Sequence, residues 1–116
     1  MMNDEALMHA FAALAQPTRM KVFRLLVREG PDGLPAGDIA RRLNVPQNTL
    51  STHLAVLARG RLVRKRRAGR HVIYAADMEG VRDMIRFLTR DCCHGHPEKC
   101  EQLLDALLPE CGPAAR

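Results

Sequence analysis

The sequence predicts a mainly α-helical fold with one small β-hairpin, and three observations support this class. Apolar residues recur at helical spacing along most of the chain, whereas strand-like patterns are confined to two short runs around Gly69. The composition is 47% hydrophobic but only 3% aromatic, so aliphatic side chains must build the core, which favours packed helices. At 116 residues the chain fits one compact domain, to which dimerisation would add further burial.

Helix boundaries are marked by capping residues, prolines and glycines. Asn3 or Asp4 can cap the first helix, Pro17 suits the first turn of the second, and Asp77 can cap the fifth. Asn44 follows the third helix at a sharp turn, because asparagine tolerates left-handed backbone geometry better than most residues. The helices are predicted at residues 4–15, from 17 to the turn at 30–33, 35–43, 47–59, 77–93 with Gly95 as the limit, and 97–108.

The hairpin is predicted from two strand-like runs, residues 62–67 and 70–75, joined at Ala68 and Gly69. Gly69 can supply the positive φ that a tight hairpin turn requires. No repeat or long linker divides the chain. Residues 1–108 are therefore expected to form a single domain, and residues 109–116 a flexible C-terminal tail.

Two absences narrow the classes of function. No charge-free apolar run approaches the roughly 18 residues needed to cross a bilayer, and Asp4 and Glu5 stand where a signal peptide would be basic. We therefore expect a cytoplasmic protein with no membrane partner. No nucleophile, base and orienting acid can be assembled, so the chain is not expected to be an enzyme; a small thiol enzyme or metal-handling protein is the alternative.

Basic residues are concentrated in one third of the chain. Between Asp38 and Asp77 there is no acidic residue, whereas the rest of the chain carries nine basic and thirteen acidic residues. This distribution is typical of a nucleic-acid binder, and a solvated basic face is the alternative. An RNA-binding module would usually add aromatic stacking platforms, which one Tyr and three Phe hardly supply. The basic residues of the acid-free stretch are Arg41, Arg42, Arg59, Arg61, Arg64, Lys65, Arg66, Arg67 and Arg70.

The order of helix, sharp turn, helix and basic hairpin predicts a winged helix-turn-helix, with the DNA-reading part at residues 35–76. The helix at 47–59 is expected to enter the major groove. His53 on this helix would either contact phosphate or brace the helix internally. Side chains expected to reach base edges are Gln47, Asn48, Ser51 and Thr52, and those expected to neutralise phosphates from the hairpin are Arg64, Arg66, Arg67 and Arg70.

Two separated motifs resemble those of a known family. The run Phe11-Ala-Ala-Leu-Ala-Gln-Pro-Thr-Arg-Met20, followed by Val22-Phe-Arg-Leu-Leu26, is similar to the opening of the ArsR/SmtB family of metal-sensing repressors. The run Thr49-Leu-Ser-Thr-His-Leu-Ala-Val-Leu57, with Gly60-Arg-Leu-Val63, is similar to the family's recognition helix and the entry to its wing. Pro46 departs from the family, which often has a serine there that can cap the recognition helix.

The resemblance covers about residues 7–88 and carries expectations about assembly and activity. It implies a homodimer built on the helices at 4–15 and 77–93. It further implies a transcriptional repressor that binds an imperfect palindromic operator in double-stranded DNA and leaves it when an effector binds. The effector does not follow from the family, because its members place their sites at different points on one scaffold.

The residues exclude two sensing sites known in the family. One arsenic site resembles a Cys-x-Cys pair in the first helix of the helix-turn-helix, but residues 35–43 contain no cysteine. A zinc or nickel site would use Asp and His pairs along the fifth helix, but residues 72–90 contain no histidine. The site must therefore lie elsewhere.

The remaining candidate ligands are Cys92, Cys93 and Cys100. Adjacent cysteines in a regular helix point about 100° apart, so both can face one ion only where the helix breaks, and Gly95 and Pro97 supply that break. Three thiolates suit a thiophilic ion. Trivalent arsenic is therefore the expected effector, with antimonite as a close relative, and similar vicinal-cysteine sites occur in one arsenite-sensing branch of the family.

Other interpretations of these cysteines stay open. Zinc or cadmium could be held by them together with His94, His96 or another fourth ligand in a tetrahedral site. A thiol-redox switch is a third alternative, since neighbouring basic residues such as Arg90 and Lys99 favour reactive thiolates. If arsenic is the effector, the two histidines are expected to be turn residues. Cys111 lies beside the predicted tail and is not expected to take part.

Overall fold

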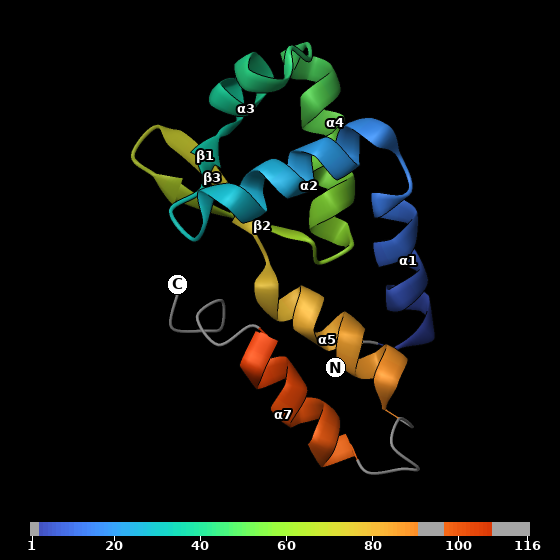
Figure 1. Ribbon diagram of the computed structural model, residues 1–116. Coiled ribbons are helices and arrows are strands. Elements are labelled where there is room, and N and C mark those ends of the chain that lie inside the picture. Colours follow the sequence, from blue (N-terminus) through green and yellow to red (C-terminus); the bar gives the residue numbers. More distant parts are fainter. Residues whose placement is uncertain (1–2, 91–96, 108–116) are drawn as a thin grey trace.

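The structure is mainly helical, with one small antiparallel sheet (Figure 1). It is a computed structural model and describes residues 3–90 and 97–107. The predicted class, mainly α with a small β-hairpin wing, is confirmed. Within the described residues, no helix is long and apolar enough to span a bilayer. The elements are α1 (Asp4–Leu14), α2 (Pro17–Glu29), β1 (Leu34–Pro35), α3 (Ala36–Leu43), α4 (Gln47–Arg59), β2 (Val63–Ala68), β3 (His71–Ala76), α5 (Met78–Thr89) and α7 (Pro97–Leu107).

A short strand that the sequence analysis did not predict completes the sheet. The strand order is β1-β3-β2, and β1 pairs antiparallel with β3, with Leu34 opposite Tyr74. Two residues are too few to show the alternation by which a strand is recognised. The prediction that the third helix begins at Pro35 is wrong by one residue, because Pro35 belongs to β1 and α3 begins at Ala36.

The hairpin turn lies one residue later than predicted. Ala68 pairs with His71, so Gly69 and Arg70 form the turn, and β2 and β3 are displaced accordingly from the predicted runs. Gly69 has a φ of 63°, which is the positive value expected of it. The prediction that Gly69 lies in the turn is therefore confirmed, whereas its partner in the turn is Arg70 and not Ala68.

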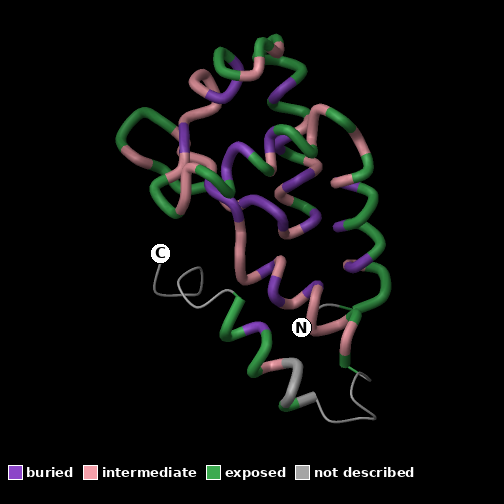
Figure 2. The backbone as a smooth tube through the Cα atoms, viewed as in Figure 1, coloured by how far each residue is buried: buried purple, intermediate pink, exposed green. Residues whose placement is uncertain are grey.

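The core is centred on α4. Leu50, Leu54 and Leu57 recur at helical spacing and are at most 1% exposed. Figure 2 shows buried segments of α2, α4 and the base of the sheet facing one another. The leucines of α4 pack in one cluster with Ala13, Val22, Leu25, Leu26, Leu34, Ile39, Ala40, Leu62, Val63 and Ala76.

The turn between α3 and α4 follows from two residues. Asn44 has φ 55° and ψ 50°, the left-handed conformation predicted for it, and its N–H bonds back to the carbonyl groups of Ala40 and Arg41. Pro46 then occupies the N-cap of α4 without a side-chain hydrogen bond, as a proline must. The helix nevertheless begins at Gln47, the predicted residue.

A second, smaller core joins α1 to α5. It consists of Leu7 and Ala10 from α1 and Met84 from α5. The side chain of Asp77 caps α5, as predicted, by accepting a hydrogen bond of 3.0 Å from the N–H of Gly80. The helix is described as Met78–Thr89, and residues 91–93, to which it was predicted to continue, lie outside the described residues.

Gly80 marks the closest approach between α5 and the segment that leads into the wing. A Cβ at this position would collide with the backbone carbonyl of Arg61. Arg61 itself has a φ of 61°, a left-handed value that is uncommon outside glycine and asparagine. Next to it, the carbonyl of Leu62 accepts a 2.8 Å hydrogen bond from the N–H of Asp77. The start of α5 is therefore fixed against the start of the wing.

We expect Gly80→Ala to destabilise the fold. Glycine to alanine in a helix is normally favourable by about 0.5–1 kcal/mol, but here the backbone must move to admit the methyl group, so we expect a loss of about 2 kcal/mol or more. Urea denaturation measures the free energy of unfolding. The control is Gly37→Ala in α3, where the nearest atom to an added Cβ is 3.7 Å away on the side chain of Arg41. Equal effects at the two positions would contradict the close approach.

Candidate DNA interface

The beginning of α4 presents a polar surface to solvent. The helix buries its leucine face in the core, so the residues between the leucines must point outwards. The four base-reading candidates are all exposed and occupy its first two turns. In Figure 1 this end of α4 lies beside α3 at the top of the molecule, away from α5 and α7. The exposed candidates are Gln47, Asn48, Ser51 and Thr52.

These polar side chains are already hydrogen-bonded to their own helix. The Ser51 hydroxyl donates to the carbonyl of Gln47 at 3.0 Å, and the Thr52 hydroxyl donates to that of Asn48 at 3.4 Å. The Oδ1 of Asn48 accepts from the N–H of Thr49 at 2.9 Å. Because their protons are engaged, the two hydroxyl oxygens are set to accept hydrogen bonds, which suits the exocyclic amines of adenine and cytosine.

His53 lies against the corner between α1 and α2. Its Nδ1 is 3.5 Å from a guanidinium nitrogen of Arg19. Arg19 in turn donates to the carbonyl groups of Ala13, at 2.6 Å, and Ala12, at 3.2 Å. His53 was expected either to contact phosphate or to brace α4 internally. The contact with Arg19 is the arrangement that bracing requires.

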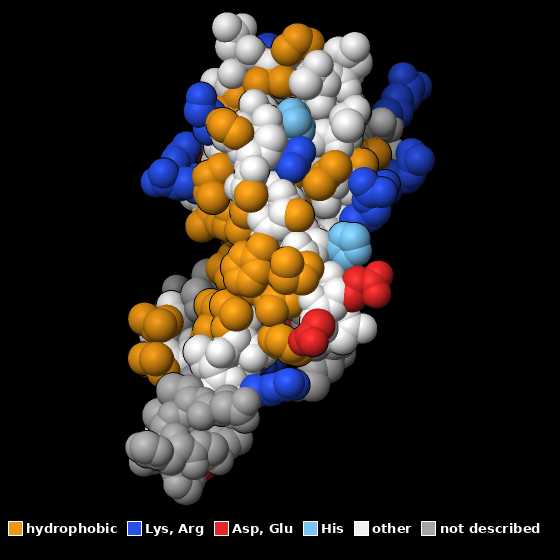
Figure 3. All heavy atoms as spheres, turned by 90° about the vertical axis from the view of Figure 1, so that its right-hand side faces the viewer, with side chains coloured by type: hydrophobic (Ala, Val, Ile, Leu, Met, Phe, Trp, Pro, Cys, Tyr) orange, Lys and Arg blue, Asp and Glu red, His pale blue; other side chains and the backbone are white. Residues whose placement is uncertain are grey.

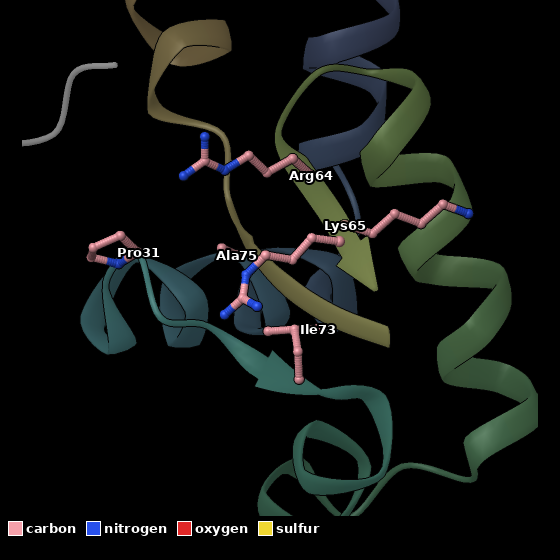
Figure 4. Close-up of a pocket in the computed structure, with 6 residues that line it drawn as sticks. Pro31, Arg64, Lys65, Ile73 and Ala75 are labelled. Atoms are coloured by element: carbon pink, nitrogen blue, oxygen red, sulfur yellow. The ribbon is translucent and has the colours of Figure 1, made fainter. Parts of the chain in front are cut away.

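The strand period divides the basic residues of the wing between two faces. Lys65 is paired with Tyr74, which packs against the core, so Lys65 stands on the helix side of the sheet and Arg67 follows on the same side. Arg64 and Arg66 stand on the outer side. Figure 4 shows the side chains of Arg64 and Lys65 leaving β2 in opposite directions, with Lys65 extending toward α4. Lys65 was not among the predicted DNA contacts, although strict alternation along 63–68 would have placed it on the same face as Arg67, which was among them.

The outer face of the wing encloses a small cavity of about 230 Å³ (Figure 4). Pro31 from the turn before β1 closes one side, and Ile73 and Ala75 of β3 line another. Arg66 crosses to this turn and donates a 3.2 Å hydrogen bond to the carbonyl of Asp32. Arg66 is thereby tied to the body of the protein on the side away from Lys65.

Much of the positive charge at the wing is not neutralised by the protein. Three arginines of the acid-free stretch pair with carboxylates outside it: Arg41 with Asp38, Arg42 with Glu29, and Arg61 with Asp83. Among the described residues, the five cations of the hairpin form no such ion pair. They are Arg64, Lys65, Arg66, Arg67 and Arg70, and all but Arg64 are exposed.

The three predicted thiol ligands fall largely outside the described residues. Cys92 and Cys93 lie in the segment 91–96, of which nothing is described. Cys100 belongs to α7, but its side chain is not described either. Within the described residues, no group of three or more His, Cys, Asp or Glu side chains could hold a metal ion. The predicted sensing site is therefore untested by the structure.

The arrangement of α3, the turn at Asn44, α4 and the basic wing defines a winged helix-turn-helix DNA-binding protein. The family model described as a helix-turn-helix domain matches residues 14–66. The chain is 31% identical over 80 residues to the transcriptional repressor SdpR of Bacillus subtilis. This alignment covers 69% of this chain and 86% of that protein. It is 40% identical over 85 residues to the HTH-type transcriptional regulator Rv2034 of Mycobacterium tuberculosis, covering 70% of this chain and 77% of that protein.

A solved structure agrees with these relatives. The ArsR-like transcriptional regulator from Rhodococcus sp. RHA1 superposes with a TM-score of 0.67 at 27% identity, over 90% of this chain and 92% of that one. The chain belongs to the ArsR/SmtB family of winged helix-turn-helix transcriptional regulators. The two relatives are a transcriptional repressor and an HTH-type transcriptional regulator.

We expect Lys65→Ala to weaken DNA binding more than Arg64→Ala. If Lys65 faces the DNA beside α4, its loss removes about one phosphate contact, and the slope of log affinity against log salt falls by about 0.9. Arg64→Ala should leave that slope nearly unchanged, because Arg64 points the other way. Fluorescence anisotropy with duplex DNA over a salt series measures both slopes. A larger change for Arg64→Ala would show that the outer face of the wing meets the DNA.

Proposed function

We propose that the chain is a homodimeric transcriptional repressor that binds an imperfect palindromic operator and leaves it when trivalent arsenic binds. The effector would be held by Cys92, Cys93 and Cys100, and antimonite would act in the same way. The base contacts would come from the start of α4, and the phosphate contacts from the wing. We place its action in the cytoplasm, with the DNA that it reads.

The packing of α7 on α5 is the observation that carries the proposed sensing site. Arg82 of α5 pairs with Asp105 of α7, and Arg86, one turn later, pairs with Glu101, one turn earlier. The two helices are therefore antiparallel, and the beginning of α7 lies beside the end of α5. This supports a single site, because Cys92 and Cys93 follow the end of α5 while Cys100 lies near the beginning of α7.

The donor set fits a trivalent thiophilic ion. Three thiols can replace the three hydroxyl groups of arsenous acid, forming three As–S bonds and releasing three molecules of water, with no change in oxidation state. Thiolates are the soft ligands that such an ion prefers. Zinc and cadmium would favour a fourth donor, for which His94 or His96 would have to serve.

The energetic demand on such a switch is modest. A hundredfold loss of operator affinity requires a coupling free energy of about 2.7 kcal/mol, which lies within the usual range for allosteric proteins. A small change in the relative placement of the two recognition helices is enough, because both must fit one rigid duplex. No refolding of the domain is needed.

Dimerisation is supported by the uncovered apolar surface of α1. Met8 is 65% exposed and Phe11 is 39% exposed, although both belong to the helix that packs on α5 through Leu7 and Ala10. Leu88 near the end of α5 is also exposed. Figure 3, which faces the α1 side of the molecule, shows hydrophobic side chains gathered across its middle. A second copy is the natural cover for this surface, since a palindromic site requires two-fold symmetry.

We expect Met8→Lys to convert the dimer into a monomer. Because Met8 is largely exposed in the single chain, the change should not disturb the fold of the monomer. Operator affinity should fall by about 100-fold or more, since a single recognition helix loses the gain from simultaneous binding. Sedimentation velocity measures the assembly state. The control is Val27→Lys on α2, another exposed apolar residue, which should remain dimeric.

Replacing Cys92, Cys93 and Cys100 by serine should leave operator binding intact and abolish its release by arsenite. The assay is a gel shift with DNA from the promoter upstream of the gene, titrated separately with arsenite, antimonite, zinc, cadmium and an oxidant. Cys111→Ser is the matched control and should respond as the unchanged protein does. Release that survives the triple change would refute the site, and release by zinc at lower concentration than by arsenite would favour the zinc or cadmium alternative.

A further inference from the structure

Four charged side chains form a continuous chain of ion pairs from α7 to the start of the wing. Glu101 of α7 accepts from the Nε of Arg86 at 2.6 Å. Arg86 donates at 3.0 Å to one carboxylate oxygen of Asp83, and the other oxygen of Asp83 accepts from Arg61 at 2.9 Å. Arg61 lies two residues before β2 begins at Val63. One carboxylate on α5 thus joins α7 to the wing.

The middle of this chain is shielded from solvent. The side chain of Asp83 is 17% exposed and that of Arg86 is 33% exposed. Hydrogen bonding to Glu101, together with the charges of Glu101 and Asp83, raises the pKa of Arg86 above its ordinary value despite partial burial. Screening by salt is weaker for such partly buried pairs than for exposed ones. The ion-pair chain should therefore keep its geometry at salt concentrations at which isolated surface pairs contribute little.

At the wing end of the ion-pair chain, the backbone of Arg61 has little conformational freedom. Arg61 is held in a left-handed conformation directly against Gly80 of α5, where no side chain fits. The hydrogen bond from Asp77 to the carbonyl of Leu62 fixes the next residue. A change at Asp83 is therefore passed to the backbone that enters β2, and hence to the wing.

We infer that Asp83 is a positioning residue that sets the wing through Arg61 according to how α7 is docked. The inference rests on the proposed function in one respect, namely that Cys100, a proposed effector ligand, immediately precedes Glu101. Ligation at Cys100 moves the first turn of α7, and Glu101 carries this movement into the ion-pair chain. The docked form of α7 is then the form with high affinity for DNA.

The structure supplies a matched control on the same two helices. Arg82 and Asp105 form a 2.7 Å ion pair between α5 and α7 that does not include Asp83. Glu101→Gln and Asp105→Asn each remove one carboxylate from α7, and both carboxylates are substantially exposed, so neither change should prevent folding. Only the first of them breaks the path to Arg61.

The test is a double-mutant cycle on operator affinity in the absence of any ion. Glu101→Gln and Asp83→Asn are each expected to weaken binding about fivefold. The double variant should be no weaker than Asp83→Asn alone, since both changes break one path. Asp105→Asn should stay within about twofold of the unchanged protein. Hydrogen exchange at residues 63–76 should rise in Glu101→Gln but not in Asp105→Asn, whereas a general loss of stability would affect both.

Two results would overturn the inference. One is additivity of Glu101→Gln and Asp83→Asn in the cycle, and the other is an equal effect of Glu101→Gln and Asp105→Asn on affinity. If Asp83→Asn does not fold, the comparison of the two α7 variants decides alone. Arsenite is added only in a separate arm: if it fails to release the unchanged protein, the proposed effector is wrong while the cycle still stands. If it does release the protein and the cycle is additive, only the ion-pair chain is wrong.

Discussion

The leucine face of α4 determines where everything else in the interface lies. Leu50, Leu54 and Leu57 anchor the helix in the centre of the core, and an α-helix that buries one face must expose the other. The polar residues at the start of the helix are presented to solvent for this reason. Rotation of α4 would expose leucines to water, and the burial of each leucine side chain stabilises the fold by about 1.5–3 kcal/mol. The orientation of the candidate DNA-reading surface is therefore as firmly set as the core itself.

The wing is placed by a backbone contact rather than by side-chain packing. Gly80 lets α5 approach the carbonyl of Arg61, and the N–H of Asp77 bonds to Leu62. Because α5 also packs on α1 and α7, it connects these two helices, which lie far from the candidate DNA surface, rigidly to the hairpin. A joint of this kind can pass a small displacement onward, since tightly packed backbone cannot absorb it locally.

Local signals in the sequence were sufficient for most of the fold. Asn44, Gly69 and Asp77 each determine the backbone at one point, and each has the conformation or cap that its chemistry predicts. Sequence reasoning failed where the outcome depends on distant partners. The strand β1 forms only because Leu34 pairs with Tyr74 of β3. The ion pair between Arg61 and Asp83 likewise joins residues that no sequence periodicity relates.

Counting charges along the chain predicted where the DNA-binding surface lies but misjudged how the positive charge is distributed. Of the nine cations in the acid-free stretch, Arg41, Arg42 and Arg61 are paired with acids that lie outside it. Five of the other six cations of this stretch, which form no ion pair among the described residues, lie on the hairpin, and the strand period divides those of β2 between the side of Lys65 and the side of Arg64. A duplex that engages α4 can approach only one of these sides closely. The salt dependence of binding should therefore reflect fewer phosphate contacts than the nine charges suggest.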